Sequence, residues 1–348
     1  MAHCAIHTSQ GSGSVGPQMK QSLSILSRTY LLIVLSVFLG LWMPVWGNEY
    51  NTERGKVGLA LGGGGTRGYA HIGVLRVLKE HNIPVDLVIG TSMGSIVGGL
   101  FSAGIACDQI EKLLMSEEFS SASELSVGKI DLVVMPISVV PRALVKKSFN
   151  GLHKGDKLAE FLNSKLPNGM KNIEQLPTKF GSVVFNLLDG KSHVLRTGDI
   201  GRALQASSAV PELRQPVPWQ GMLLVDGGVT DNLPCLLARD AGADILIAVN
   251  VDERLYPQDA NSFNAIGSVS NRCVTANLAR LDGDEEKFAD VVIHPEVSSI
   301  KLLSRNRLDM ERAIKAGEEA AKQAIPGIIK ALEKIGIRVP QYTTSELY

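Results

Sequence analysis

The stretch that decides the fold is "VIGTSMGSI", residues 88–96. An apolar run leads into the five residues Gly-Thr-Ser-Met-Gly, and an apolar pattern resumes after them. G-x-S-x-G is typical of a nucleophile elbow, a tight turn in which a strand passes into a helix and leaves a serine hydroxyl exposed. Glycines at such a turn remove side chains that would collide. The pattern predicts a nucleophile at Ser92 between Gly90 and Gly94, with a simple glycine-marked turn as the alternative.

Strand-like and helix-like segments alternate around this turn. Residues 56–61 and 85–90 are short and apolar, as expected of buried strands, and residues 66–82 between them have the apolar spacing of an amphipathic helix. A second helix is expected to begin after Ser92. This strand–helix–strand–helix unit predicts parallel pairing of its strands with a right-handed crossover.

The rest of the chain carries further signals of both kinds. Residues 180–199 are expected to form a hairpin that turns at Asp189-Gly190. Strands separated by helices predict an α/β layered domain. The remaining expected elements are strands at 222–228, 243–251 and 289–297, and a helical region from 302 to 337, interrupted at Pro326.

One apolar, proline-broken stretch departs from this pattern. "VVMPISVVPRALV" (133–145) lies in a less regular region, residues 106–170. It is interpreted as a loop packed on the core, with a mobile cap lining an acyl-chain site as the alternative. No linker divides the chain after residue 47, so residues 48–348 are predicted to form a single domain.

A glycine run follows the first predicted strand. "LGGGGTRG" (61–68) fits the dinucleotide-binding pattern G-x-G-x-x-G, which also requires an acidic residue at the end of the second strand. Asp86 opens that strand instead, and the Ser92 elbow occupies its end, so nucleotide binding is disfavoured. In the other interpretation, main-chain N–H groups of the run form an oxyanion hole for acyl transfer, with donors about 2.7–3.1 Å from the oxyanion.

An aspartate follows a later apolar strand. In "VDGGVTDNLP" (225–234), Asp226 comes directly after the strand and is followed by Gly227 and Gly228. Ligand sites of open α/β sheets collect at the carboxyl ends of their strands. Taken alone, Asp226 reads as an ordinary turn residue. Beside the glycine run and the elbow, it is a candidate catalytic group.

Four ordered blocks together resemble the patatin-like phospholipase family: the glycine run, the elbow, "ASSAVPELRQPV" (206–217) and the D-G-G sequence. The resemblance covers residues 56–295. It implies a three-layer α/β/α fold with a mainly parallel central sheet, and a lipid or phospholipid substrate met at a membrane surface. It implies neither a metal nor another cofactor.

The resemblance also assigns roles to residues. Ser92 is the nucleophile and Asp226 the base of a dyad that has no histidine. Leu213 and Arg214 lie where other members often carry bulkier aromatic or apolar residues, in the region expected to shape the acyl pocket. The residues assigned to the oxyanion hole are Gly63, Gly64, Gly65, Arg67 and Gly68.

This assignment is chemically self-consistent. A serine hydroxyl is a poor nucleophile at its own pKa and needs an adjacent base. An aspartate with a reference pKa of about 3.9 is a weak base, so the site must hold Asp226 close to Ser92 and poorly solvated. The expected reaction is hydrolysis of lipid acyl esters through an acyl-enzyme, of phospholipase A, lysophospholipase or esterase type.

Two other functions compete with this one. A triad of the α/β-hydrolase type is the first, because Ser92, Asp226 and His294 follow its chain order. Against it, the elbow follows only the second strand, with no antiparallel strands before it, and His294 is interpreted as a core or surface residue. The second is a non-catalytic lipid-binding protein on the same fold, which can dispense with the serine or aspartate that this chain retains.

Composition narrows the class of function. The 348 residues include 35 Lys and Arg against 35 Asp and Glu, which leaves no electrostatic footprint for nucleic acid. The three cysteines after residue 47, Cys107, Cys235 and Cys273, form neither a disulfide framework nor a metal-ligand pattern. No protein partner follows from the sequence.

The N-terminus carries a separate signal. Residues 30–47 are uncharged and apolar, and Lys20 and Arg28 precede them, which predicts a leader over residues 1–47 that serves as a secretory signal or a membrane anchor. The protein is therefore expected to be periplasmic or secreted, or anchored to the membrane. Because the leader is long for a signal, Met19 is an alternative start.

Overall fold

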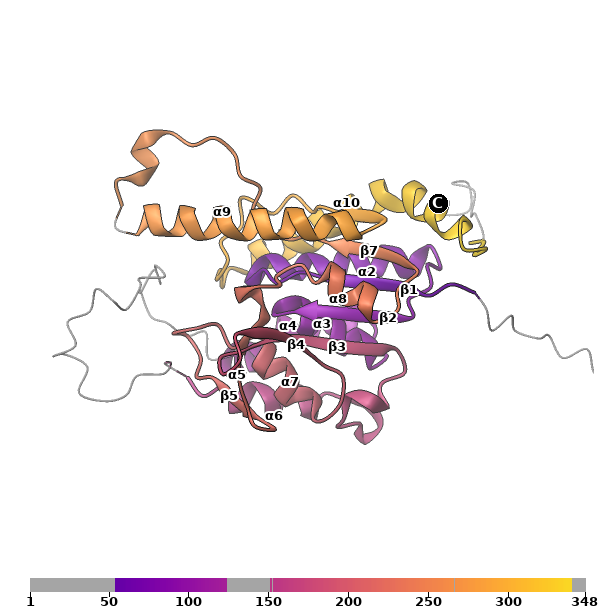
Figure 1. Ribbon diagram of the computed structural model, residues 1–348, viewed down its shortest axis with the longest axis horizontal. Coiled ribbons are helices and arrows are strands. Elements are labelled where there is room, and N and C mark those ends of the chain that lie inside the picture. The colour runs from indigo at the N-terminus through magenta and orange to yellow at the C-terminus, as the bar shows by residue number, and fades with distance from the viewer. Residues whose placement is uncertain (1–53, 124–150, 152, 266, 340–348) are drawn as a thin grey trace, which may run out of the picture. The chain divides into compact units, whose positions relative to one another are not determined.

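One mixed sheet of eight strands forms the frame of the protein, in the order β5-β6-β3-β2-β1-β7-β8, with β4 paired to β3 outside this order (Figure 1). The computed structural model describes residues 54–123, 151, 153–265 and 267–339, and all of them belong to the unit Arg54–Tyr348. The strands are β1 Val57–Leu61, β2 Leu87–Thr91, β3 Lys179–Asn186, β4 Lys191–Leu195, β5 Val217–Trp219, β6 Met222–Asp226, β7 Ile245–Val249 and β8 Val291–Ile293. The predicted leader, the boundary after it and the stretch 133–145 lie outside the described residues.

Most of the sheet is parallel, as predicted. β1 pairs in parallel with β2 and β7, β2 pairs in parallel with β3, and β7 pairs in parallel with β8. β4 and β6 both run antiparallel to β3, and β5 runs antiparallel to β6. The carboxyl ends of the five parallel strands therefore share one edge of the sheet.

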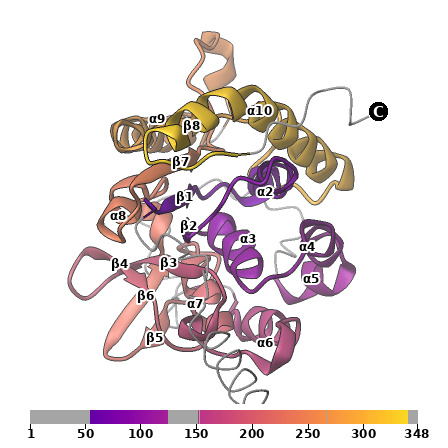
Figure 2. The same cartoon turned by 90° about the vertical axis from the view of Figure 1, so that its right-hand side faces the viewer.

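Helices cover both faces and make three layers. α2, α3, α7 and α10 pack on one face over the large core that contains Leu59 and Val88. α8 packs on the other face over a smaller core that contains Leu87 and Ile89, and Figure 2 shows α3 and α8 on opposite sides of β1 and β2. The helices are α2 Ala70–Glu80, α3 Met93–Ser102, α4 Cys107–Leu114, α5 Glu117–Ala122, α6 Asp156–Ser164, α7 Ile200–Ser207, α8 Cys235–Asp240, α9 Ser268–Glu285 and α10 Arg307–Glu333. The three-layer α/β/α architecture is confirmed.

The register of β3 decides where the site lies. β2 ends where Thr91 pairs with Val183, and β6 ends where Asp226 pairs with Val184, the next residue along β3. β4 pairs with the side of β3 that faces away from β2. Since β4 also covers the residues of β3 that pair with β6, β6 must lie on the same side of β3 as β2. β2 and β6 run in opposite directions, and their carboxyl ends meet there. This meeting brings Ser92, the residue after β2, to Asp226.

The expected hairpin and all the expected strands are present, but the prediction at Pro326 was wrong. β3 and β4 form the hairpin, with Gly190 at a positive φ of 68° in its turn. α10 continues through Pro326, although an interior proline costs about 3 kcal/mol. Pro326 is exposed, while a buried stripe that includes Ala321, Ile325 and Ile328 continues on both sides of it. Packing of that stripe offsets the missing hydrogen bond.

Several elements were absent from the sequence prediction. α4 to α6 lie within the region expected to be less regular, and β5, α7, α8 and α9 were also missed. α8 and β5 have only six and three residues, too few for a periodic signal. None of the helices in the described part of the chain has both the length and the apolar character needed to cross a membrane.

Candidate active site

Ser92 lies at a strained turn between β2 and α3. Its φ of 53° and ψ of −119° place a residue with a side chain in a region that such residues rarely adopt. Two hydrogen bonds hold it there: its N–H donates to the Ser207 hydroxyl at 3.0 Å, and its carbonyl accepts the N–H of Ile96 at 3.1 Å. The Ser207 hydroxyl in turn donates to the carbonyl of Val183 at 2.6 Å, where β2 gives way to β6.

The elbow packs directly on the end of β1. A side chain at Gly94 would collide with the carbonyl oxygens of Leu61 and Gly62. The absence of a side chain lets the first turn of α3 approach the strand that leads into the glycine run. The elbow and the glycine run therefore form a single packed unit.

Asp226 is in direct contact with the serine. The Ser92 hydroxyl donates to Asp226 Oδ2 at 2.7 Å, and the N–H of Gly228 donates to Asp226 Oδ1 at 2.9 Å. The main-chain N–H of Asp226 donates to the carbonyl of Ala209 at 3.0 Å. Both carboxylate oxygens are bound, and the side chain has little freedom to turn away from Ser92.

Burial makes Asp226 a stronger base than an exposed aspartate. The residue is only 6% exposed, and burial raises its pKa to about 6, although the hydrogen bonds from Ser92 and Gly228 and the charge of Arg214 act in the opposite direction. Near neutral pH the carboxylate is mostly ionised, yet its pKa lies close to the working range of a general base. Asp226 is thus both close to Ser92 and poorly solvated, as an aspartate that acts as a base must be.

Arg214 supplies a buried positive charge near Asp226. It is 5% exposed, and its guanidinium donates to the carbonyls of Ser208 at 2.5 Å and Ser123 at 2.7 Å. Its charge favours the ionised form of Asp226. Leu213 beside it is buried at 1% exposure. Leu213 and Arg214 are thus both buried beside the site.

The glycine run passes close to Ser92. A side chain at Gly63 would meet the Cβ of Ser92 at 3.2 Å. The N–H of Gly63 donates to the carbonyl of Asn232 at 3.1 Å, and the N–H of Arg67 donates to the carbonyl of Gly64 at 3.0 Å. In the described structure, the N–H groups of Gly64 and Gly65 have no hydrogen-bond acceptor. These two amides are the ones in the run that remain available to a ligand.

The outer side of the glycine run rests on residues 300–304, a segment that we call the strap. The carbonyl of Leu302 accepts the N–H of Thr66 at 2.8 Å, and the carbonyl of Ser304 accepts the Thr66 hydroxyl at 2.8 Å. Gly65, at a φ of 51°, faces Leu302 so closely that a side chain would collide with its carbonyl oxygen. The strap therefore holds the glycine run in its position beside Ser92.

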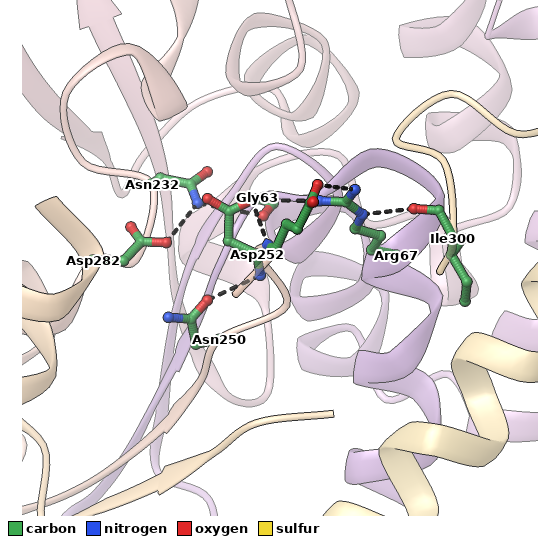
Figure 3. A network of polar contacts seen from close by, with 8 residues as sticks. Gly63, Arg67, Asn232, Asn250, Asp252, Asp282 and Ile300 are labelled. Carbon is green, nitrogen blue, oxygen red and sulfur yellow. Dashed lines mark hydrogen bonds and ion pairs between the residues drawn. The ribbon is translucent and has the colours of Figure 1, made fainter. Parts of the chain in front are cut away.

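Arg67 anchors the run through its side chain (Figure 3). Its Nε donates to the carbonyl of Ile300 at 2.7 Å, and its guanidinium forms ion pairs with Glu253 at 2.9 Å and Asp252 at 3.6 Å. Gly68, the last residue assigned to the oxyanion hole, lies in the short helix η1 (Gly65–Tyr69), where a side chain would collide with Met93. The side chain of Arg67 holds the loop in place.

Asn232 and Asp282 form a supporting pair beside the glycine run, which the sequence analysis did not predict. The carbonyl of Asp231 accepts the Thr91 hydroxyl at 2.8 Å, and the next residue, Asn232, binds Gly63 through its carbonyl. The Asn232 amide donates to Asp282 Oδ2 at 3.1 Å, and Figure 3 shows this contact. These residues tie the elbow strand to the glycine run.

Asp282 comes from α9, on the far side of this network. It is 1% exposed, and burial together with the nearby charge of Asp252 raises its pKa to about 7. Asn232 was visible in the sequence as part of the D-G-G block. Asp282 had no such signal, because α9 itself was not predicted.

Two histidines, His294 and His71, have contacts other than Ser92 and Asp226. His294 follows β8 and pairs with Glu286 at 2.9 Å, and β1 and β7 separate its strand from β2. His71 is fully buried, lies 2.8 Å from the carbonyl of Gly62, and has a pKa lowered by burial to about 4. The described residues contain no cluster of His, Cys, Asp and Glu arranged to hold a metal ion.

The sequence is similar to those of known proteins. The sequence profile of the patatin-like phospholipase family matches residues 59–239. An uncharacterised NTE family protein of Mycobacterium tuberculosis is 33% identical over 229 residues, which are 65% of this chain and 58% of that protein. The lysophospholipase NTE1 of Scheffersomyces stipitis is 33% identical over 197 residues, which are 56% of this chain and 12% of that protein. Many of the relatives are thus much longer than the stretch that they share with this chain.

A solved structure is also similar. VipD from Legionella pneumophila aligns over 80% of this chain and 67% of its own length, with 15% sequence identity and a TM-score of 0.42.

Proposed function

The chain belongs to the patatin-like phospholipase family, and on this premise we propose that it hydrolyses the acyl esters of lipids by a Ser92–Asp226 dyad. The observation that carries the proposal is the 2.7 Å hydrogen bond from the Ser92 hydroxyl to a buried carboxylate. A relative named as a lysophospholipase favours a phospholipid or lysophospholipid substrate.

In the proposed reaction, Ser92 attacks the carbonyl carbon of the ester while Asp226 Oδ2 takes the hydroxyl proton. The oxyanion that forms accepts hydrogen bonds from the N–H groups of Gly64 and Gly65, in the manner of an oxyanion hole. Asp226 then returns the proton to the leaving alcohol oxygen, and the acyl group stays on Ser92.

Deacylation reverses the roles. A water molecule gives a proton to Asp226 and attacks the acyl carbon, and the second tetrahedral intermediate uses the same amides. Collapse of this intermediate returns the proton to Ser92 and releases the fatty acid. The direct contact between Ser92 and Asp226 favours the dyad over a triad, because a triad needs a histidine between the two.

The test is formation of the acyl-enzyme. The wild-type protein should be labelled by a fluorophosphonate and should release fatty acid from defined phospholipids and lysophospholipids. Ser92→Ala should do neither. Ser164→Ala, at an exposed serine at the end of α6, is the matched control and should behave as the wild type. Equal labelling of the wild type and Ser92→Ala would contradict the proposal.

The leader carries a separate proposal. The basic flank and apolar run of residues 1–47 support export or membrane anchoring of the enzyme. A reporter that is active only after export, fused to residues 1–60, should be active. An intact but silent cytosolic fusion would contradict export.

A further inference from the structure

Exposed apolar side chains gather at the edge of the sheet where Ser92 lies. Five of them are 40–66% exposed, and we call them the apolar rim: Leu187, Leu188, Val229, Leu302 and Leu303. Single exposed apolar residues scattered over a protein surface need no explanation. An exposed group of apolar side chains, in contrast, marks a site of contact with another molecule or a membrane. These five belong to three segments, and strand direction and hydrogen bonds indicate where each segment lies.

Strand direction and hydrogen bonds place each loop. Leu187 and Leu188 follow directly after β3, whose last residues pair with β6. Val229 ends the short helix η6 (Gly227–Val229) that begins right after Asp226. Leu302 and Leu303 lie in the strap, which is bonded to the glycine run after β1. The rim therefore flanks Ser92 from both the Asp226 side and the glycine-run side.

The strap connects the rim to the catalytic geometry. Three of its carbonyls, those of Ile300, Leu302 and Ser304, bind Thr66 or Arg67 at 2.7–2.8 Å. The same short segment exposes 48% of Leu302 and 40% of Leu303. A force on the exposed leucines thus acts on the loop that carries the free amides.

We propose that the apolar rim inserts into the surface of a phospholipid bilayer and presents bilayer acyl esters to Ser92, with the strap holding the glycine run during insertion. This inference rests on the proposed function, because a lipid ester dissolved in a bilayer must reach the site from that phase. Amphipathic helices at a bilayer bury their apolar faces about 5–10 Å into the boundary between headgroups and acyl chains, and the rim is expected to reach the same layer.

The balance of charge over the chain favours a zwitterionic surface. Residues 48–348 carry 33 basic and 35 acidic residues, so the chain has no general attraction to anionic lipid. Lys301, which is exposed next to Leu302, can extend its ammonium toward lipid phosphates while its stem lies along the apolar layer. Insertion of the leucines, rather than net charge, then provides the attraction, and binding should change little with salt.

Local insertion can be measured in the full chain without relying on catalysis. Leu303→Cys and Phe288→Cys are made in a Ser92→Ala, Cys4→Ser, Cys273→Ser protein and labelled with an environment-sensitive fluorophore. Phe288 is the matched control, because it is also 40% exposed but ends the helix η8 (Glu286–Phe288) before β8, at the opposite edge of the sheet. Phosphatidylcholine vesicles with and without spin-labelled acyl chains are then added.

The label at residue 303 should shift to shorter wavelength and be quenched by the spin-labelled lipid, whereas the label at residue 288 should do neither. Equal quenching at both positions, or none at residue 303 while the protein sediments with vesicles, would overturn the proposal. A shift at residue 303 that depends on protein concentration and not on lipid would assign the rim to contact between copies of the chain, and would also overturn it.

Turnover gives a second readout. The double variant Leu302→Ser/Leu303→Ser should lower the ratio of vesicle hydrolysis to hydrolysis of a soluble monomeric ester by roughly tenfold, and Phe288→Ser should leave this ratio unchanged. An unchanged ratio in the double variant would contradict the role of the rim. If no Ser92-dependent hydrolysis of any ester is found, the proposed function fails, and the insertion measurement still decides the docking surface.

Discussion

The two halves of the site are held in different ways. The half that we propose to react, called the reacting half, consists of Ser92 and Asp226; it has a strained backbone and a desolvated carboxylate. The supporting half, the glycine run, is held by a network of buried charged and amide side chains centred on Arg67 and Asn232. The strained backbone and the desolvated carboxylate lie where we propose that the reaction occurs, and the side-chain hydrogen bonds and ion pairs are concentrated in the loop that would keep the geometry. Substitutions in the two halves should therefore separate activity from stability.

The largest effect is expected at the base. Asp226→Asn should lower kcat/KM by roughly 10³–10⁴-fold, because a neutral amide cannot take the proton from Ser92. Burial raises the pKa of Asp226 to about 6, so the wild-type fold loses stability as the pH rises from about 4 through 6. At pH 8, Asp226→Asn should then melt no lower than the wild type. A variant that loses activity only because it unfolds would break the contrast between the two halves.

Removing the anchor of the supporting half should affect both quantities. Arg67→Met breaks the ion pairs with Glu253 and Asp252 and the hydrogen bond to Ile300. Loss of one partner from such a buried pair costs roughly 3–5 kcal/mol of unfolding free energy. Activity should also fall, since the free amides lose their position. Denaturant unfolding and ester turnover measure the two losses, and an unchanged unfolding midpoint would show that Arg67 does not anchor the loop.

A smaller effect is expected behind the run. Asp282→Ala removes the acceptor of the Asn232 amide and leaves a buried donor unpaired, at a cost of roughly 1–3 kcal/mol. Turnover should fall because Asn232 also holds Gly63. Asp282→Asn keeps an acceptor oxygen and is the control that should restore most of the activity. If both variants lose equally, the charge of Asp282 and not its hydrogen bond is what matters.

The smallest effect is expected at the rejected histidine. His294→Gln should change turnover by less than about threefold, because in general acid–base catalysis only a group at the reacting atoms gives the much larger effects. Its present contact is with Glu286. A well-folded His294→Gln protein as inactive as Ser92→Ala would restore the triad.

Local pattern predicted the reacting half because its signals are contiguous. The elbow, the glycine run and the D-G-G sequence each require particular residues within a few positions, and β1, β2 and β6 were found at the strands expected. The supporting half joins residues far apart in the chain, such as Asn232 with Asp282 and Thr66 with Leu302. No short pattern encodes those pairs.

The same limit explains the misses in the fold. α8 and β5 are too short to show periodicity, and α10 runs through Pro326 because buried residues on both sides hold it. The availability of individual amides was also invisible in the sequence. Gly63 looks equivalent to Gly64 and Gly65, and only the structure shows its N–H bound to Asn232.

The measurement that most directly tests the dyad is the pH dependence of kcat/KM for a soluble ester. If Asp226 is the base, activity should rise with pH through a single ionisation near its pKa of about 6 and be about tenfold lower at pH 5 than on the plateau. His294→Gln should show the same curve. A profile that is flat from pH 4 to 8, or an ionisation near pH 6 that disappears in folded His294→Gln, would contradict the account.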